Sequence, residues 1–421
     1  MNPSLPSGYR LGTQAVARAS LVALALFAFL APLITVITAG PSGAAGEGNA
    51  LRQIVYVVIF GLTLASAKVL DHPARLGAVP LSIVLFLLWA AVTLVGAVNP
   101  EVGARRLFLT VLVIYTVFML VDRVGFEGTV GALRAALLVV LVLNYVAVLG
   151  WPEWGIHQAA TEDDPSIVGA WRGVLLQKNF AGAVCAMTVI LFAFDAASLR
   201  PWWRLAVIAL AGFFLYHSES KTSTALLVAS LAFAWLFLRY EPRHRTAVCA
   251  ATWVTLAALA LMAWLNWDAL TAPLLREDAL TGRVQIWPPL LAYWRDHWLT
   301  GSGFGSFWNV GDPEPITAYT DGWVSQITSG HNGFLDLLVQ TGVPGLVLAL
   351  AAAAIVPASR LLSLTDADAG RRSLVLAMIL FSVGHNVTES SLFDRDATIH
   401  IFLMVALALL RLEARASSEP A

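Results

Sequence analysis

The chain is dominated by apolar runs of about twenty residues that are separated by short polar loops. A helix of about twenty apolar residues spans the hydrocarbon core of a bilayer. We identify twelve such runs, at residues 15–38, 51–70, 78–98, 106–121, 131–150, 179–197, 203–217, 223–238, 246–266, 332–356, 373–390 and 397–411. The sequence therefore predicts an all-α integral membrane protein with about twelve transmembrane helices, which form a single polytopic membrane domain over residues 1–421.

The overall composition supports this class and excludes others. Hydrophobic residues make up 58% of the chain and charged residues only 13%, whereas a soluble domain carries about 25% charged residues. The net charge of −1 argues against nucleic acid as a partner. Cys185 and Cys249 both fall in or beside apolar runs and form neither a disulfide framework nor a metal-ligand spacing. We predict no metal and no cofactor.

The distribution of Lys and Arg between the loops predicts the orientation of the chain. Loops on the side of the N-terminus carry fifteen cations and those on the other side carry ten. Because Lys and Arg are enriched in cytoplasmic loops, we expect both termini in the cytoplasm. The longest loop, residues 267–330 between spans nine and ten, then lies outside the membrane on the opposite, periplasmic side.

This large loop has the composition of an ordered segment. It holds ten aromatic residues, six of them Trp, as is typical of a segment at a membrane interface. Residues 284–298 form a helix-like run in which Leu290, Leu291, Trp294 and Trp298 share one side, as in an in-plane amphipathic helix. Residues 301–305 read Gly-Ser-Gly-Phe-Gly. That turn either reverses the chain or lets backbone approach a ligand, and chain reversal is the simpler interpretation.

A polar motif stands where the large loop enters span ten. His331 and Asn332 begin the span, and Asp336 and Gln340 follow Asn332 at steps of four, so these residues share one helix face. Ionisable groups at membrane depth are costly and usually mark functional sites. The sequence therefore predicts that the functional site lies at this entry point.

Five motifs, taken in order, resemble the signature of the O-antigen ligase and Wzy-type polymerase superfamily. They are Gln177-Lys178-Asn179, Ser218 to Ser223, Gly282-Arg283-Val284-Gln285-Ile286-Trp287, Gly301 to Gly305, and His331-Asn332 followed by Gly342 and Gly345. The resemblance covers about residues 165–396. One position departs from it, because the family usually has Arg where this chain has Lys221. Lys keeps the charge and loses the bidentate geometry toward phosphate.

The resemblance implies a glycosyltransferase fold of the GT-C type and a reaction in the bacterial inner membrane. Such proteins move a glycan from undecaprenyl pyrophosphate to a hydroxyl on the periplasmic face, among membrane lipids. We expect an O-antigen ligase whose acceptor is lipid A-core oligosaccharide, in lipopolysaccharide biosynthesis. The alternatives are a Wzy-type O-antigen or exopolysaccharide polymerase, whose acceptor is a growing glycan, and a transporter of lipid-linked glycans. Polar groups gather at one outer rim instead of being spread through many spans, which favours an enzyme.

The residue types suit this chemistry. Histidine ordinarily titrates near neutral pH, so His331 is predicted to be the general base that deprotonates the acceptor; the competing interpretation is a helix-capping or core histidine. Arg283 is predicted to hold the donor diphosphate, against a rim salt bridge to Glu277 or Asp278. Secondary candidates for the diphosphate are Arg172, Lys178 and Lys221, each of which could equally be an interfacial cation.

Other polar residues are given smaller roles. Asn179 and Asn332 are predicted to support the site, and Glu389 at the outer end of span eleven is predicted to orient His331 or an arginine. His385 repeats the Gly-His-Asn triplet with no long loop before it, so it is predicted to pack between helices. Asp394 and Asp396 flank Arg395 and are expected to pair with it, and no metal is assigned to them.

Overall fold

The computed structural model describes residues 7–39, 50–160, 165–266, 283–365, 367–395 and 397–417, and within these ranges the ordered structure is helical. The described chain contains no strand, and one isolated bridge joins Ile156 to Trp171. The predicted all-α class is confirmed.

A helix lies at each of the twelve predicted apolar runs. These helices are α1 (Ser7–Ala39), α2 (Ala50–Ala67), α3 (Leu81–Thr93), α4 (Pro100–Val124), α5 (Phe126–Gly150), α7 (Lys178–Ala193), α8 (Pro201–His217), α9 (Lys221–Phe237), α10 (Arg245–Leu265), α13 (Gly333–Leu350), α15 (Ala369–His385) and α16 (Thr398–Ala416). Shorter helices are α6 (Pro152–Gly155), α12 (Trp287–Asp296) and α14 (Val356–Ser363), and a π-helical turn at Ala351–Ile355 joins α13 to α14.

Length and composition alone qualify fewer of these helices as membrane spans. Among the described residues, five segments are long and apolar enough to cross a bilayer: Gly12–Leu30, α2, α4, α5 and Gly333–Ser363. A sixth is obtained if α9 and residues Pro242–Thr252, which meet at a bend of 108°, count as one span. The chain is therefore a multi-pass membrane protein, and the number of twelve spans stays a prediction.

Polar caps and a glycine begin several of these helices. Asn99 accepts a hydrogen bond from the backbone of Val102 at the start of α4, and Asp368 caps α15 in the same way. Such caps satisfy N–H groups that have no partner inside the helix. Gly125 has φ of +79° between α4 and α5, a conformation that glycine adopts without strain, so these two long helices follow each other directly.

The core of the bundle lies where helices are apolar on every side. Most residues of α7 and α16 are buried, as is the central part of α4, and a helix that is hydrophobic all round belongs inside a protein or a membrane. Helix α7 packs against α8 and α9, and α15 packs against α9 and α16. Large apolar side chains on α2, α8, α9 and α10 stay exposed, as expected of helices that face lipid.

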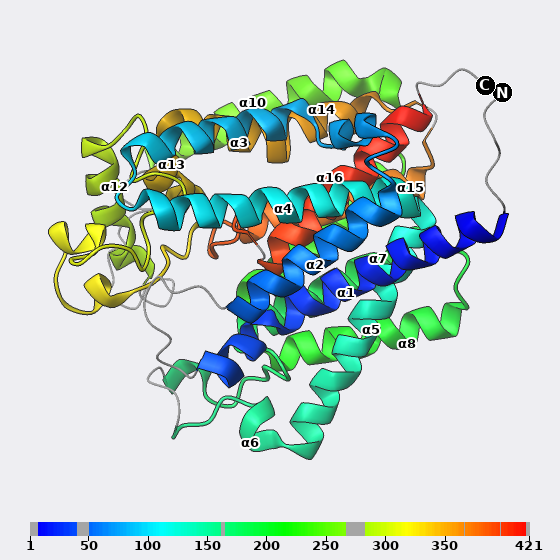
Figure 1. The fold of residues 1–421 in the computed structure, drawn as a ribbon, viewed down its shortest axis with the longest axis horizontal. Helices are drawn as coiled ribbons and strands as arrows, with labels where there is room; N and C mark the ends of the chain where they lie inside the picture. The colour runs from blue at the N-terminus through cyan, green and yellow to red at the C-terminus, as the bar shows by residue number, and fades with distance from the viewer. Residues whose placement is uncertain are drawn as a thin grey trace.

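The bundle has two distinct ends. Figure 1 shows α12 and the beginning of α13 at one end, whereas the start of α1 and the end of α16 lie at the other. Helix α4 runs between the two ends, so its first turns lie near α12 and its last turn lies near the start of α1. The candidate site residues Arg283 and His331 lie at the α12 end, which we call the loop end.

The described part of the large loop, residues 283–330, is packed into a small core of its own. Ile286, Leu290, Tyr293, Phe307 and Trp308 are buried together with Ile316, Val324 and Val339. The segment is therefore ordered, as predicted, although residues 267–282 lie outside the described part of the chain. The predicted face of the helix is partly wrong: Tyr293 is buried in place of Trp298, which is 57% exposed, because α12 ends at Asp296.

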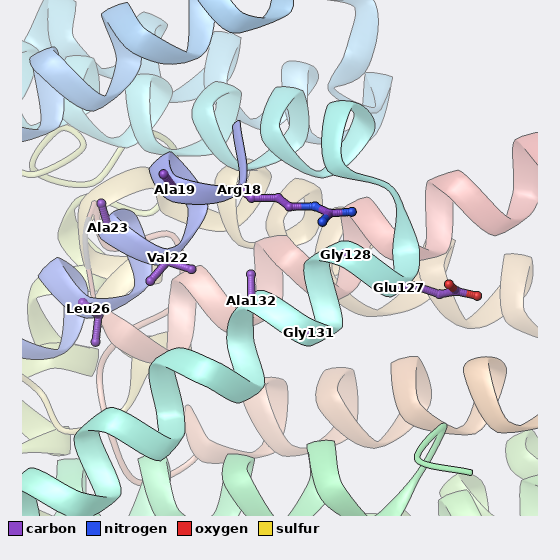
Figure 2. A pocket seen from close by; sticks show the side chains of 9 residues that line it. All are labelled: Arg18, Ala19, Val22, Ala23, Leu26, Glu127, Gly128, Gly131 and Ala132. Atoms are coloured by element: carbon purple, nitrogen blue, oxygen red, sulfur yellow. The ribbon is translucent and has the colours of Figure 1, made fainter. Parts of the chain in front are cut away.

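A long groove of about 720 Å³ lies between α1 and α5 (Figure 2). Small or apolar side chains line it, from Ala19 to Leu26 on α1 and from Gly128 to Ala132 on α5. Arg18 and Glu127 stand at one end of the groove, and Glu127 pairs with Arg371 at 2.9 Å. We call this surface the α1–α5 groove; it lies beside the first turn of α5, where Glu127 contacts Arg371 in the first turn of α15.

Candidate active site

At the loop end, Glu389 joins three parts of the chain that are far apart in sequence. Its Oε1 accepts a hydrogen bond of 2.7 Å from Nδ2 of Asn179, at the start of α7. The same oxygen accepts one of 2.6 Å from Nη2 of Arg283, which follows the undescribed part of the large loop. Both charged side chains are largely buried, with 15% of Arg283 and 10% of Glu389 exposed. This charge-assisted contact is strong because little water competes for it.

His331 completes this cluster from the opposite side of the carboxylate. Its Nδ1 lies 3.7 Å from Oε2 of Glu389, and its side chain is 37% exposed. Among the described residues, the buried Nδ1 has no hydrogen-bond partner, so Glu389 is its nearest acceptor. The backbone of His331 has φ of +47°, a strained conformation for a residue other than glycine that is found mainly where surrounding contacts impose it.

Those contacts are backbone hydrogen bonds to the turn that follows α15. The N–H of Asn332 donates to Oγ of Ser390 at 3.1 Å, and its Nδ2 donates to the carbonyl of Val387. The N–H of Gly333 donates to the carbonyl of Glu389 at 3.0 Å. Asn332 also caps α13 through Oδ1. The turn of His331 and the turn of Glu389 therefore hold each other in register.

The surroundings of Glu389 keep its carboxylate ionised. Burial of the side chain favours the neutral acid, but the neighbouring His331, Arg283 and His385 favour the charged form, and together they lower the pKa of Glu389 below its ordinary value. At neutral pH the cluster thus contains a carboxylate that faces an imidazole on one side and a guanidinium on the other.

Asp336 and Gln340 hold the large loop on α13. Asp336 is buried, and its carboxylate accepts hydrogen bonds from Nε1 of Trp308 at 2.9 Å and from the N–H of Gly330. Oε1 of Gln340 accepts one of 2.8 Å from the N–H of Gly305. The polar helix face that sequence analysis marked as functional therefore divides into His331 and Asn332 at the cluster and two residues that fix the loop.

The glycines of the His motif have a structural reason. Gly342 has φ of +64° and interrupts the helical geometry inside α13. At this kink the N–H of Val343 donates to the carbonyl of Trp298 at 2.9 Å. A Cβ at Gly342 would collide with the backbone of Leu299. The large loop therefore contacts α13 at two places along the helix: near its start, through Gly330 and Asp336, and at the kink, through Trp298 and Val343.

The Gly-Ser-Gly-Phe-Gly turn reverses the chain, as the simpler interpretation predicted. Gly301, Gly303 and Gly305 all have positive φ. The N–H of Ser302 donates to the carbonyl of Val339, and the carbonyl of Ser302 accepts from Val98. The turn therefore packs on α13 and on the connection between α3 and α4.

The three secondary cations are placed by their neighbours along the chain. Nε of Arg172 donates to the carbonyl of Trp154 at 2.9 Å. Lys178 begins α7 directly before Asn179, and its N–H donates to Nε2 of His157. Lys221 begins α9. The next residue, Thr222, contacts Thr388, so α9 begins beside the turn that contains Glu389.

The remaining polar residues named in the sequence lie outside the Glu389 cluster or outside the described part of the chain. His385 is buried at the end of α15, with Nε2 3.3 Å from Oγ of Ser223, which confirms its predicted packing role. Oδ1 of Asp394 lies 3.6 Å from Nε of Arg395, as expected of a charge pair. Asp396, Glu277 and Asp278 lie outside the described residues, and so does Gly282. Within the described ranges, no three His, Cys, Asp or Glu side chains come close enough to hold a metal ion.

Sequence analysis missed the importance of the turn after α15. Residues 386–391 read Asn-Val-Thr-Glu-Ser-Ser, and Asn386, Thr388 and Ser390 all bind elements of the cluster. The available signal was the density of polar residues in a turn between two apolar runs. Such a turn needs only one or two of them to reverse direction.

Two comparisons identify the kind of protein to which this site belongs. The profile of the family described as O-antigen ligase matches residues 205–350, which include Arg283 and His331. The chain is also 24% identical over 347 residues to the exopolysaccharide production protein ExoQ of Rhizobium meliloti strain 1021, a match that covers 79% of this chain and 76% of that protein. Both matches agree in kind with the resemblance to the O-antigen ligase and Wzy-type superfamily that the sequence motifs carry.

Proposed function

We propose that the protein transfers a glycan from a polyprenyl pyrophosphate, undecaprenyl pyrophosphate in bacteria, to a hydroxyl of an acceptor glycan. The observation that carries this proposal is the cluster in which one buried carboxylate, Glu389, contacts both Arg283 and Asn179 and faces His331. It combines a candidate base with a candidate cation for the leaving group, in a partly exposed position at the ends of several helices.

His331 is the general base in this proposal. A carboxylate beside Nδ1 favours the tautomer with the proton on that nitrogen, which leaves the lone pair of Nε2 for the acceptor hydroxyl. The hydroxyl oxygen then forms a bond to the anomeric carbon as the bond from that carbon to the diphosphate oxygen breaks. The hydroxyl proton goes to His331, and the leaving group departs as polyprenyl pyrophosphate.

Arg283 stabilises the leaving diphosphate in this scheme. Only Nη2 of Arg283 is hydrogen-bonded to Glu389, and a guanidinium carries five N–H donors. The other N–H donors of Arg283 are proposed to bind phosphate oxygens, which Arg binds with bidentate geometry. Arg172, Lys178 and Lys221 are proposed to extend the positive field around the diphosphate. Asn179 and Asn332 hold the cluster in place.

The proposed reaction needs neither nucleotide nor metal. The pyrophosphate leaving group already activates the anomeric carbon. The distribution of Lys and Arg supports a loop end on the periplasmic face of the inner membrane, with both termini in the cytoplasm. We therefore expect transfer by the purified full-length chain with EDTA present and ATP absent. Recovery of an EDTA-inhibited reaction by Mg²⁺ alone would require a metal site and overturn this part of the proposal.

The acceptor defines two candidate functions. Transfer to lipid A-core oligosaccharide makes the protein an O-antigen ligase, and transfer to a growing glycan makes it a Wzy-type polymerase. The similarity to an exopolysaccharide production protein spans most of both chains, and this favours the polymerase as an alternative of equal standing. A transporter of lipid-linked glycans is less well supported, because a transport path needs no paired base and leaving-group cation.

The decisive experiment compares acceptors with the purified protein in lipid vesicles. The donor is the polyprenyl-pyrophosphate repeat unit extracted from the host, and the acceptors are lipid A-core and a second copy of the lipid-linked repeat unit. Ligated lipid A-core supports the ligase, and products of two or more repeat units support the polymerase. Movement of the donor across the vesicle without any new glycosidic bond would contradict both.

A further inference from the structure

A second polar cavity lies directly beside the cluster. It measures about 130 Å³ and is enclosed by the first turns of α13 and α4, residues 304–309 of the large loop, and residues 390–395 after α15. This volume is about ten times the minimum that admits one water, so the cavity has room for a small polar molecule such as a sugar ring.

The walls of this cavity combine aromatic rings with side chains that both donate and accept hydrogen bonds. Phe304, Trp308 and Phe393 line it, and all three are buried. Arg106, Asn309, Asp394 and Arg395 also line it, along with several serine and threonine hydroxyls. Two arginines and two aspartates leave the lining without a strong net charge, so the cavity suits a neutral polar molecule better than an anion.

Part of this lining is fixed before any ligand binds. Nη1 of Arg106 donates to the carbonyls of Gly305 and Trp308 at 2.7 and 2.9 Å. Asp336 is held by Trp308 and Gly330. A sugar ring presents apolar C–H faces and hydroxyls that both donate and accept, and it matches a rigid pocket of aromatic rings and mixed polar groups.

The cavity is connected to the candidate base through two serines. Oγ of Ser329 accepts the N–H of His331 at 3.2 Å, and Oγ of Ser390 accepts the N–H of Asn332 at 3.1 Å. Both serines also line the cavity. A molecule in the cavity therefore sits one side chain away from the backbone that carries His331.

We propose that this cavity binds one sugar residue of a glycan substrate and so sets which hydroxyl or anomeric carbon reaches His331. This inference rests on the proposed glycan transfer. The sugar belongs either to the acceptor or to the donor, and its chemistry is the same in both cases. Thr328 and Arg395 are specificity residues, because both line the cavity without a described contact to the Glu389 cluster.

The test fills or alters the cavity and measures both substrates. Thr328→Trp introduces a bulky ring at an exposed lining position, and Arg395→Gln removes the positive charge and the planar guanidinium of a second lining residue. Gln326→Trp, two residues away on the exposed surface, is the matched control. We expect KM for one glycan substrate to rise about tenfold in both cavity variants, equal to ~1.4 kcal/mol of binding, with kcat within about twofold and the control unchanged. A rise for the acceptor assigns the sugar to the acceptor, and a rise for the donor assigns it to the donor.

A binding measurement separates this inference from the proposed function. The probe is the repeat-unit oligosaccharide released from the host's own surface polysaccharide, and its Kd is measured on the His331→Ala protein with and without Thr328→Trp. Weaker binding in the double variant supports the cavity even if His331 proves not to be the base. Equal Kd values, together with unchanged KM values for both substrates, would overturn the inference whatever the role of His331.

Discussion

The loop end and the α1–α5 groove are both hollows in the same bundle, but they differ in what lines them. The groove is several times larger, at about 720 Å³ against 130 Å³ for the cavity beside the cluster. Its walls are small apolar side chains, and its one acidic side chain, Glu127, is already paired with Arg371. At the loop end, charged and polar groups from three other chain segments, Asn179, Arg283 and His331, converge on Glu389. A choice by cavity volume alone would therefore select the groove and not the loop end.

The difference follows from what a bilayer can supply. Lipid tails are as apolar as the groove, so they fill it without a specific contact. No lipid tail can satisfy the buried carboxylate of Glu389, which needs donors from the protein or from a substrate. We therefore expect changes at the loop end to act on the reaction and changes in the groove to act weakly or not at all.

The largest effect is expected for the candidate base. His331→Ala should lower the rate of glycan transfer by about 10²-fold or more, the range for loss of a general base, with insertion and expression retained. His244→Ala, at an exposed turn between α9 and α10, is the control and should keep wild-type activity. The measurement is in-vitro transfer at matched protein amounts. Near-wild-type transfer by His331→Ala would remove it as the base and direct attention to Glu389.

Arg283 should come next. Arg283→Lys keeps a positive charge but loses the planar fork, so it cannot contact Glu389 and a diphosphate together as Arg can. We expect a loss of about tenfold or more, mainly in donor KM. Lys221→Arg should be tolerated, because it restores the residue usual in the family. If Arg283→Lys were silent while Lys221→Ala abolished transfer, the leaving group would bind at the start of α9 instead.

Glu389 should affect both the rate of transfer and the stability of the protein in acid. The pKa of Glu389 is lowered in the folded protein, so its contribution to stability is present above the ordinary pKa of Glu, about 4.3, and is lost as pH falls through the lower folded value. Glu389→Gln removes this titration and the negative charge beside Nδ1. We expect slower transfer at pH 7 and a folded state whose melting temperature depends less on pH below about 5. An unchanged pH profile of both rate and Tm would show that Glu389 only packs.

The comparison also shows how far the sequence could lead. The helices could be predicted, because apolar runs are written in consecutive residues, and so could the motifs of His331, Arg283 and Asn179, which the structure brings together around Glu389. The meeting of Glu389 with Asn179 joins positions 210 residues apart, and nothing in the local pattern encodes it. Asp336 illustrates the same limit, since its carboxylate marked a functional face in the sequence and serves in the structure to hold Trp308.

Gly342 tests the link between the kink in α13 and the loop end. Gly342→Ala places a Cβ at φ of +64° against the backbone of Leu299. Strain of this kind costs about 1–3 kcal/mol, so we expect a lower Tm in detergent and partial loss of transfer through a displaced loop. Gly131→Ala, in the groove where a Cβ meets nothing within 4 Å, is the control. Equal Tm values for the two variants would mean that the loop does not depend on the kink.

The smallest effect is expected inside the groove itself. Ala23 lines the groove on α1, and its side chain is exposed. Ala23→Leu fills part of the groove with apolar volume that lipid tails would otherwise occupy, so burial gained against the protein replaces burial against lipid. Stability should change by less than about 0.5 kcal/mol, as for substitutions away from special features, and transfer should stay within about twofold. If Ala23→Leu instead abolished transfer at unchanged Tm, the groove would have to hold a ligand that the reaction needs, and the division between the two ends would fail.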